Sequence, residues 1–462
     1  MAFSSISFLF YFLPLFFAVY WLIPARWKNA ILAAGSLFFY AWGDLRSVPL
    51  LALSILVTYA MGRAMPPDVS VRRRRCLLIL GLIFHLAVLV VFKYAEFFFG
   101  SFLPLPELAL PLGISFYTFH AMSYLIDVYR GSAPPQKSLL QLSVYLAMFP
   151  KLVMGPIAPY HELSVALSRR ELTVEDTAAG CFRFAVGLGK KAMLADTLAG
   201  LVSGIWGDLS ELTVLGAWLG LFGYALQLYF DFSGYSDMAI GLGQMLGFRL
   251  PENFRYPYLC CSVSDFWRRW HVSLGAWFRE YLYFPLGGSR RGVLRTLRNL
   301  LIVWLATGLW HGASWNYVLW GLYFGVLICM EKLLAPVFRG CAKTSLLAGL
   351  YRPVSLLLAL LGWVIFRAPD LPAAGQYLFA LFGGAAAVSA QARLYLHDYL
   401  PALLLGCIGA TPLISRLAGR LNARLRPAAQ TAARTALLLA LLACSTLWLL
   451  NGSFQSFIYT QF

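Results

Sequence analysis

The chain of 462 residues is 60% hydrophobic and only 12% charged, and its mean hydropathy is +0.70. A soluble core of this length cannot hide so much apolar surface, so the composition excludes an ordinary soluble protein and indicates an integral membrane protein. The net charge of +17 does not indicate a nucleic-acid partner, because the basic residues lie between apolar segments rather than on one soluble face.

Apolar runs near the length that crosses a bilayer recur along the whole chain. We expect spans near residues 5–23, 29–43, 48–62, 76–92, 111–129, 139–156, 180–204, 212–230 and 232–248. Less regular segments follow near residues 298–310, 313–333, 350–366, 373–388, 399–418 and 434–451, and some of these are short enough to be re-entrant. The pattern predicts an all-α integral membrane protein with one polytopic domain over residues 1–462.

Three basic clusters between the apolar runs predict the topology of the chain. They are Arg26 with Lys28, Arg72 to Arg75, and the group Arg416, Arg420, Arg424, Arg426 and Arg434. The positive-inside bias assigns all three clusters to the cytoplasm. We therefore expect a multi-pass protein of the inner membrane that contacts membrane lipids, with an even number of full crossings and both termini extracytoplasmic.

Residues 251–299 are too polar to span a bilayer and too aromatic to be a linker. Their tryptophan, phenylalanine and tyrosine side chains are typical of the headgroup level, so we expect an interfacial or re-entrant segment within the domain. Seven arginines and two acidic residues lie between Asp265 and Arg298, a net charge of +5. A strongly anionic ligand on the cytoplasmic side matches this charge.

Pairs with Gly-x-x-x-Gly spacing predict close helix packing. They are Gly216 with Gly220, Gly243 with Gly247, Gly308 with Gly312, and Gly321 with Gly325. Each pair is a weak signal alone. The eight cysteines lack Cys-x-x-Cys spacing and no His-x-x-x-His motif occurs, so neither a disulfide framework nor a metal site is predicted.

His311 is the strongest candidate for catalysis. It lies in an apolar run from Leu300 to Met330, where an ionisable side chain is costly and is often functional. A neutral imidazole can take a proton from an attacking hydroxyl while a thioester is opened. His271, forty positions earlier, either approaches His311 through the fold or anchors an interfacial helix.

Asp231 and Asp237 are carboxylates within apolar runs, and each needs a partner. Two interpretations stay open: structural salt bridges, for which Arg255, Arg268 and Arg269 are candidate partners, or a role in lining a catalytic tunnel. Asp127 is expected to anchor a helix end.

Several motifs closely resemble the membrane-bound O-acyltransferase (MBOAT) family, in its bacterial polysaccharide branch. They are Pro251-Glu-Asn253-Phe, Asp265-Phe-Trp-Arg-Arg-Trp-His271, Trp310-His311-Gly-Ala-Ser-Trp315, Tyr229-Phe-Asp-Phe-Ser-Gly-Tyr-Ser-Asp237 and the tail Phe457-Ile-Tyr-Thr-Gln-Phe462. The resemblance implies a multi-helix bundle with a central tunnel, an essential His311, and His271 lining the same passage. We expect tunnel or substrate-binding positions at Trp310, Asn253, Asp231, Ser233 and Tyr235.

The resemblance also implies a reaction. Acetyl from cytoplasmic acetyl-CoA would be passed to an extracytoplasmic partner protein that O-acetylates a cell-surface polysaccharide of the alginate, peptidoglycan or cellulose type. The arginines expected to bind the donor phosphates are Arg268, Arg269, Arg279, Arg290 and Arg291, although phospholipid headgroups suit them too. The alternatives are D-alanyl transfer to teichoic acid from a carrier protein, and a transporter of acyl groups or lipids without chemistry.

Overall fold

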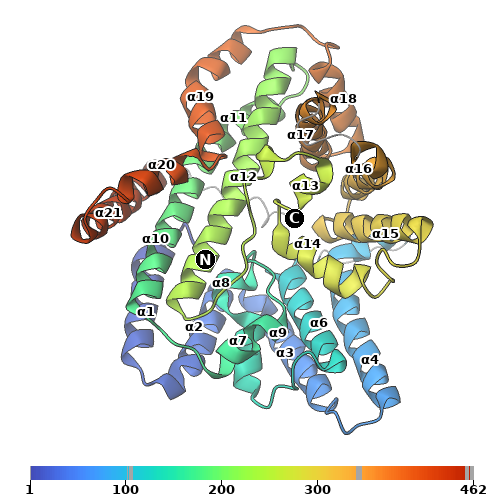
Figure 1. Ribbon diagram of the computed structural model, residues 1–462, viewed down its shortest axis with the longest axis vertical. Coiled ribbons are helices and arrows are strands. Elements are labelled where there is room, and N and C mark those ends of the chain that lie inside the picture. Colours follow the sequence, from blue (N-terminus) through green and yellow to red (C-terminus); the bar gives the residue numbers. More distant parts are fainter. Residues whose placement is uncertain (1, 101, 103–107, 340–345, 453–456, 458–462) are drawn as a thin grey trace. The chain divides into compact units, whose positions relative to one another are not determined.

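The computed structural model describes residues 2–100, 102, 108–339, 346–452 and 457, and these residues form helices and connecting loops without a strand (Figure 1). The prediction of an all-α protein is confirmed. Residues 458–462 of the tail motif lie outside the described residues.

Five of the described helical segments are long and apolar enough to cross a membrane. They are Leu45–Arg63, Val71–Phe99, Trp315–Leu334, Gly349–Arg367 and Pro427–Asn451. A sixth candidate is the pair α19 (Ala390–Gly409) and α20 (Leu413–Asn422), which bends by 67°. Phe8–Leu22 is a shorter apolar helix. The chain is therefore a multi-pass membrane protein.

At three places the structure joins or breaks the predicted spans. The spans expected at 212–230 and 232–248 are one helix of 32 residues, α12 (Val214–Met245), because the buried Asp231 has an ion-pair partner and does not interrupt the helix. The span expected at 139–156 breaks at Met148, just ahead of Pro150, and the one at 399–418 breaks around Pro412.

The chain divides into two compact units. Unit 1 comprises the described residues of Met1–Leu188, Tyr235–Glu252 and Leu449–Gln461, and unit 2 comprises those of Gly189–Gly234 and Asn253–Trp448. The boundary at Gly234 falls inside α12, so the first part of this helix belongs to unit 2 and its end to unit 1.

Unit 1 contains α1 (Leu13–Leu22), α2 (Lys28–Gly43), α3 (Val48–Arg63), α4 (Val71–Leu89), α5 (Ala95–Phe99), α6 (Ile114–Arg130), α7 (Leu139–Ala147), α8 (Phe149–Leu152), α9 (Tyr160–Ser168) and α10 (Val174–Gly189) up to Leu188. Its core is aromatic: Tyr235 stacks on Phe3 at a ring distance of 4.7 Å and meets Phe457 edge-on at 5.1 Å. Three sequence-distant parts of the chain therefore share one core.

An ion-pair network joins α10 to the last part of α12 within unit 1. Arg183 of α10 donates to Asp237 at 2.9 Å and to both carboxylate oxygens of Glu252 at 2.6 Å. The salt-bridge interpretation therefore describes Asp237, with Arg183 as its partner.

Unit 2 begins with a π-helix (Lys190–Ala195) and α11 (Asp196–Trp206), and contains the first part of α12. It continues through α13 (Val263–Trp267), α14 (Val272–Phe278), a π-helix (Arg279–Tyr283), α15 (Val293–His311), α16 (Trp315–Arg339), α17 (Leu346–Arg367), α18 (Leu371–Leu381), α19, α20 and α21 (Pro427–Asn451). The helices α15 and α16 lie side by side, and α16 also packs against α17 (Figure 1).

Glycines allow α15 and α16 to approach closely. A Cβ on Gly308 would collide with the carbonyl oxygen of Tyr317, and one on Gly321 with the carbonyl oxygen of Trp304. Both obstacles are backbone atoms, which cannot swing aside. The predicted packing role of these Gly-x-x-x-Gly pairs is therefore confirmed for α15 and α16.

We expect Gly308→Ala to lower stability by about 1–3 kcal/mol, because the helices must separate to accommodate the methyl group. Thermal unfolding of the detergent-solubilised chain measures this. Gly419→Ala is the matched control: nothing lies within 4 Å of its Cβ position in α20, so the same change should leave the midpoint equal or slightly raised. Equal midpoints for the two variants would contradict the packing argument.

Four large aromatic residues of the 251–299 segment are buried inside unit 2. Trp270, Trp277, Phe278 and Tyr281 are at most 7% exposed. The ring of Trp270 packs against that of Trp363 at 4.8 Å. These four side chains therefore form a packing core around the segment, and the interfacial or re-entrant placement of the segment in the membrane stays a prediction.

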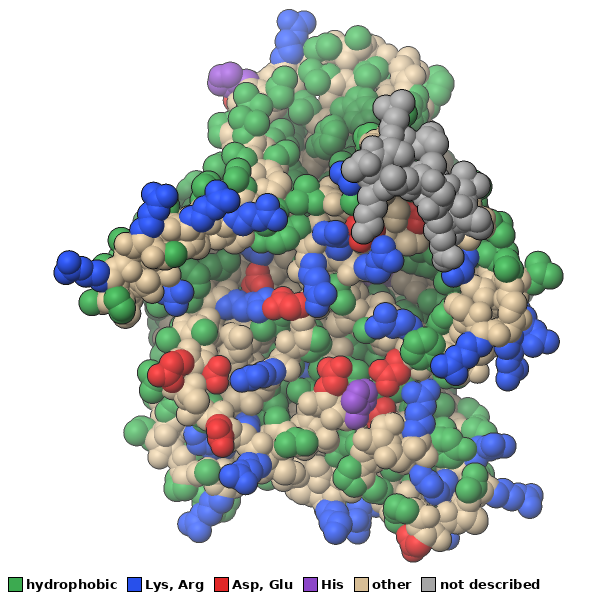
Figure 2. All heavy atoms as spheres, in the orientation of Figure 1, with side chains coloured by type: hydrophobic (Ala, Val, Ile, Leu, Met, Phe, Trp, Pro, Cys, Tyr) green, Lys and Arg blue, Asp and Glu red, His purple; other side chains and the backbone are tan. Residues whose placement is uncertain are grey.

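The helix α20 differs from its neighbours because none of its residues is buried. Leucines and arginines form two separate rows along it, and the arginines continue into the start of α21. Figure 2 shows Lys and Arg side chains gathered over α20 and the start of α21, at the left edge of the view.

Candidate functional site

His271 lies between α13 and α14 in a backbone conformation that is uncommon for a residue with a side chain. Its φ is +47° and its ψ is 50°. Neighbouring backbone hydrogen bonds hold this turn: Val272 N–H donates to the carbonyl of Asn253 at 3.0 Å, and Arg255 N–H donates to that of Arg269 at 2.9 Å. Such local strain persists where the surroundings impose it, and it is frequent at functional sites.

Asn253 determines the tautomer of His271. The side-chain oxygen of Asn253 accepts hydrogen bonds from the backbone N–H of Ser273 at 3.2 Å and from the Ser273 hydroxyl at 3.0 Å. The same oxygen lies 3.1 Å from Nδ1 of His271. The contact with the Ser273 N–H identifies this atom as the amide oxygen, which has no hydrogen to donate, so Nδ1 must carry the hydrogen. The other ring nitrogen, Nε2, is then the one with the lone pair.

The surroundings of His271 favour a neutral ring. The side chain is 1% exposed, and the ring of Phe232 meets it edge-on at 4.7 Å. Burial holds the pKa of His271 below its usual value because the charged imidazolium would lose its solvation. A neutral imidazole with a lone pair on Nε2 can accept a proton or a hydrogen bond from a substrate.

His311 is the last residue of α15 and is 4% exposed. Its ring lies edge-on to Trp320 of α16 at 4.9 Å and to Phe366 of α17 at 5.3 Å. Gly312 follows, and its extended backbone ends the helix. A Cβ at Gly312 would collide with the ring of Tyr317, so a glycine is needed at this position. Aromatic rings from α16 and α17 therefore hold His311.

Trp310 connects the two histidines. Its indole ring lies 5.9 Å from the ring of His271 and 4.8 Å from that of His311. All three residues belong to unit 2, together with Asn253. Of the two interpretations left open for His271, the structure favours an approach to His311 through the fold. We call His271, His311, Trp310 and Asn253 the histidine centre.

The other three expected tunnel residues lie on α12. Asp231 is 1% exposed and pairs with Lys191 at 2.7 Å, and Lys191 also lies 2.7 Å from Asp196. The salt-bridge interpretation therefore describes Asp231, with Lys191 as the partner. Ser233 is buried in unit 2, whereas Tyr235 belongs to the aromatic core of unit 1.

The five expected donor-binding arginines are on the surface of unit 2. Arg268, Arg279, Arg290 and Arg291 are exposed, and Arg269 is partly buried. Asp265 pairs with Arg269 at 2.9 Å and approaches Arg268 at 3.5 Å. The remaining three are exposed cations in or next to the segment that connects α14 to α15.

Two supporting residues were missed from the sequence. Ser273 shares the Asn253 oxygen with His271, and Glu331 accepts hydrogen bonds from the backbone N–H groups of Val263 at 2.6 Å and Ser264 at 2.8 Å. Glu331 thereby satisfies the first donors of α13, the helix that leads to His271. Glu331 is an acidic residue next to an apolar run, which is a signal of the same kind that singled out Asp231.

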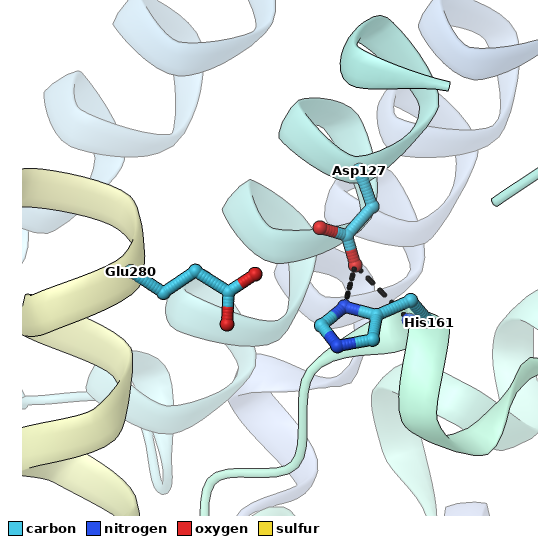
Figure 3. Close-up of side chains that lie close together, drawn as sticks. All are labelled: Asp127, His161 and Glu280. Carbon is cyan, nitrogen blue, oxygen red and sulfur yellow. Dashed lines mark hydrogen bonds and ion pairs between the residues drawn. The ribbon is translucent and has the colours of Figure 1, made fainter. Parts of the chain in front are cut away.

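A contact between a carboxylate and a third histidine lies in unit 1. Asp127 accepts hydrogen bonds from the backbone N–H of His161 at 3.0 Å and lies 3.1 Å from its Nδ1 (Figure 3). Asp127 is fully buried, so it joins α6 to the start of α9 rather than anchoring an exposed helix end.

Comparisons with known proteins identify the family. Residues 105–354 match the family model described as membrane-bound O-acyltransferase. "Probable alginate O-acetylase AlgI" of Azotobacter vinelandii is 42% identical over 394 residues, which cover 83% of this chain and 78% of that protein. "Peptidoglycan O-acetyltransferase" of Helicobacter pylori is 35% identical over 82% of this chain and 80% of that protein. "Teichoic acid D-alanyltransferase" of Bacillus subtilis is 29% identical over 47% of this chain and 58% of that protein.

The family match covers more than half of the chain, and it includes all four residues of the histidine centre. Relatives well above 30% identity extend the similarity over most of the sequence. The protein therefore belongs to the membrane-bound O-acyltransferase family and is an acyltransferase.

Proposed function

We propose that this acyltransferase takes acetyl from acetyl-CoA on the cytoplasmic side of the inner membrane and passes it across the membrane for O-acetylation of a cell-surface polysaccharide. The observation that carries the proposal is the histidine centre, in which two buried imidazoles share one tryptophan neighbour. The names of the relatives, alginate O-acetylase and peptidoglycan O-acetyltransferase, support polysaccharide acetylation.

The proposed reaction is direct acyl transfer to a hydroxyl group. His311 accepts the proton of the attacking hydroxyl, and the hydroxyl oxygen bonds to the thioester carbonyl carbon. The C–S bond then breaks, and the departing thiolate takes the proton from the imidazolium. The products are an acetyl ester and the free thiol of coenzyme A. No metal is needed for this sequence of steps.

His271 has a supporting role in the proposed mechanism. Its Nε2 lone pair can hold the attacking hydroxyl by accepting a hydrogen bond, while Asn253 fixes the ring from the other side. The indole ring of Trp310 packs next to the rings of both His271 and His311. We propose that Ser233 and Asp231 lie along the path by which substrates reach these rings. Tyr235 belongs to the aromatic core of unit 1, and we give it a packing role.

The exposed arginines suit the phosphates of the donor. Coenzyme A carries several negative charges, and guanidinium groups bind phosphate oxygens in pairs. We expect Arg290→Ala with Arg291→Ala to raise the KM for acetyl-CoA about 10-fold and to leave kcat nearly unchanged, because these contacts act equally in the ground and transition states. Steady-state assays on purified membranes measure both constants. A fall in kcat at unchanged KM would contradict the proposal that Arg290 and Arg291 bind acetyl-CoA.

The proposal also includes the topology and the partner. The basic clusters Arg72–Arg75 and Arg416–Arg434 lie on the cytoplasmic side, and both termini lie outside. An extracytoplasmic protein with a reactive hydroxyl then receives the acetyl group and hands it to the polysaccharide.

Proteoliposomes provide the test of this function. Acetyl-CoA with a labelled acetyl group is supplied on one side, and label on a polysaccharide or partner protein is measured on the other. We expect label to appear there only when the histidine centre is intact. Transfer of D-alanine from a carrier protein, without acetyl transfer, would favour the D-alanyl alternative, and movement of intact donor without thiol release would favour transport.

A further inference from the structure

The helix α20 has no buried residue and so makes little packing contact within unit 2. It has ten residues, none of them buried, and isolated helices of this length are marginal in water. Leu413, Leu417 and Leu421 form one row four residues apart and are 48–64% exposed. A row of exposed leucines on a short helix needs an apolar partner to remain in place.

A row of positive charge runs beside the leucines. Arg416, Arg420 and Arg424 are also four residues apart, and all three are exposed. Like charges at this spacing destabilise a helix. The sequence from 411 to 434 contains no acidic residue, and none of the three arginines has an ion pair within the described part of the chain. The helix therefore lacks negative charge as well as apolar contacts.

The position of α20 indicates that the bilayer supplies both the apolar partner and the negative charge that the helix lacks. Four residues separate its end at Asn422 from α21, which is long and apolar enough to cross a membrane. The helix thus lies next to the end of a candidate span, where a bilayer offers acyl chains and headgroups together. A helix with one apolar row and one basic row is typical of a segment lying flat in an anionic membrane surface.

We propose that α20 is a docking surface for anionic phospholipid headgroups. The leucine row enters the boundary of the acyl chains, and the arginine row binds the phosphates of acidic lipids. One hydrogen bond links α20 to the loop that carries Asn253: Ser415 Oγ lies 3.2 Å from the hydroxyl of Tyr256, three residues after Asn253. Lipid at this surface therefore also steadies the segment that carries Asn253.

Hydrogen–deuterium exchange of the full chain in nanodiscs tests the proposal. In discs of phosphatidylcholine mixed with phosphatidylglycerol, we expect amides of residues 413–426 to exchange about 10-fold more slowly than in phosphatidylcholine alone. The triple variant R416Q/R420Q/R424Q should abolish this difference. Because the readout is exchange and not acetyl transfer, the result is independent of the proposed function.

A matched control removes the same charge elsewhere. R290Q/R291Q/R295Q loses three exposed arginines before and at the start of α15 and should keep the lipid dependence at α20. High salt should weaken the dependence in the unaltered chain, since it screens exposed charges. If the amides of residues 413–426 were equally protected in both lipid mixtures, only the leucine row would bind the membrane, and the proposal would be overturned. Rapid exchange of these amides in both mixtures would overturn it too. If the triple variant does not fold, R420Q alone should reduce the difference.

Discussion

His311→Ala should reduce acetyl transfer by about 10²–10⁴-fold, the contribution typical of a positioned general base. The rings that pack on His311, those of Trp310, Trp320 and Phe366, cannot take up a proton in its place. The measurement is labelled acetyl transferred per unit of protein in proteoliposomes.

Trp320→Phe serves as the control for packing around His311, because it keeps an aromatic ring at the same edge-on contact. We expect that variant to lose far less activity than His311→Ala at equal membrane levels. Acetylation that persists in His311→Ala, with normal expression and thermal stability, would remove His311 from the proposed mechanism.

Asn253→Leu should lower kcat about 10–100-fold, the usual effect of removing a residue that orients a functional histidine. Leucine has a similar size but no acceptor, so Nδ1 of His271 and the backbone N–H of Ser273 both lose their partner. His271 can then rotate or change tautomer, and its lone pair no longer points consistently toward the substrate. Rates at saturating acetyl-CoA measure this effect.

Asn253→Asp separates positioning from a purely structural role. A carboxylate beside the ring stabilises the imidazolium and so raises the pKa of His271 from its depressed value. Since the ring must be neutral to accept a hydrogen bond at Nε2, the acidic limb of the kcat profile should move to higher pH. A variant with an unchanged pH profile and a simple loss of thermal stability would show that Asn253 only supports packing.

The all-α class and most helix positions followed from hydrophobic run length, because a bilayer requires long apolar segments. The break expected near Asp231 was wrong for a physical reason: its partner Lys191 is forty residues away, and local sequence does not show that a buried carboxylate is paired. The aromatic residues of 251–299 illustrate the same limit, since tryptophan suits both a headgroup layer and a packed core.

The histidine centre was only partly accessible from the sequence. His311 and His271 were chosen from their neighbourhoods and from the family resemblance, and Asn253 from its motif. That the Asn253 oxygen accepts from Ser273, and therefore sets the tautomer of His271, depends on a turn with positive φ at His271. No local pattern predicts that turn, because residues with side chains seldom adopt it.

The aromatic core of unit 1 joins Phe3, Tyr235 and Phe457. During synthesis on the ribosome, Phe3 enters the membrane hundreds of residues before Phe457 exists. The N-terminal helices of unit 1 must therefore remain in the membrane with part of their aromatic core unpacked until translation is nearly finished. Membrane insertion factors that shield such unfinished helices should stay bound to this chain unusually long, and a ribosome stalled ahead of Phe457 should hold unit 1 in a protease-sensitive form.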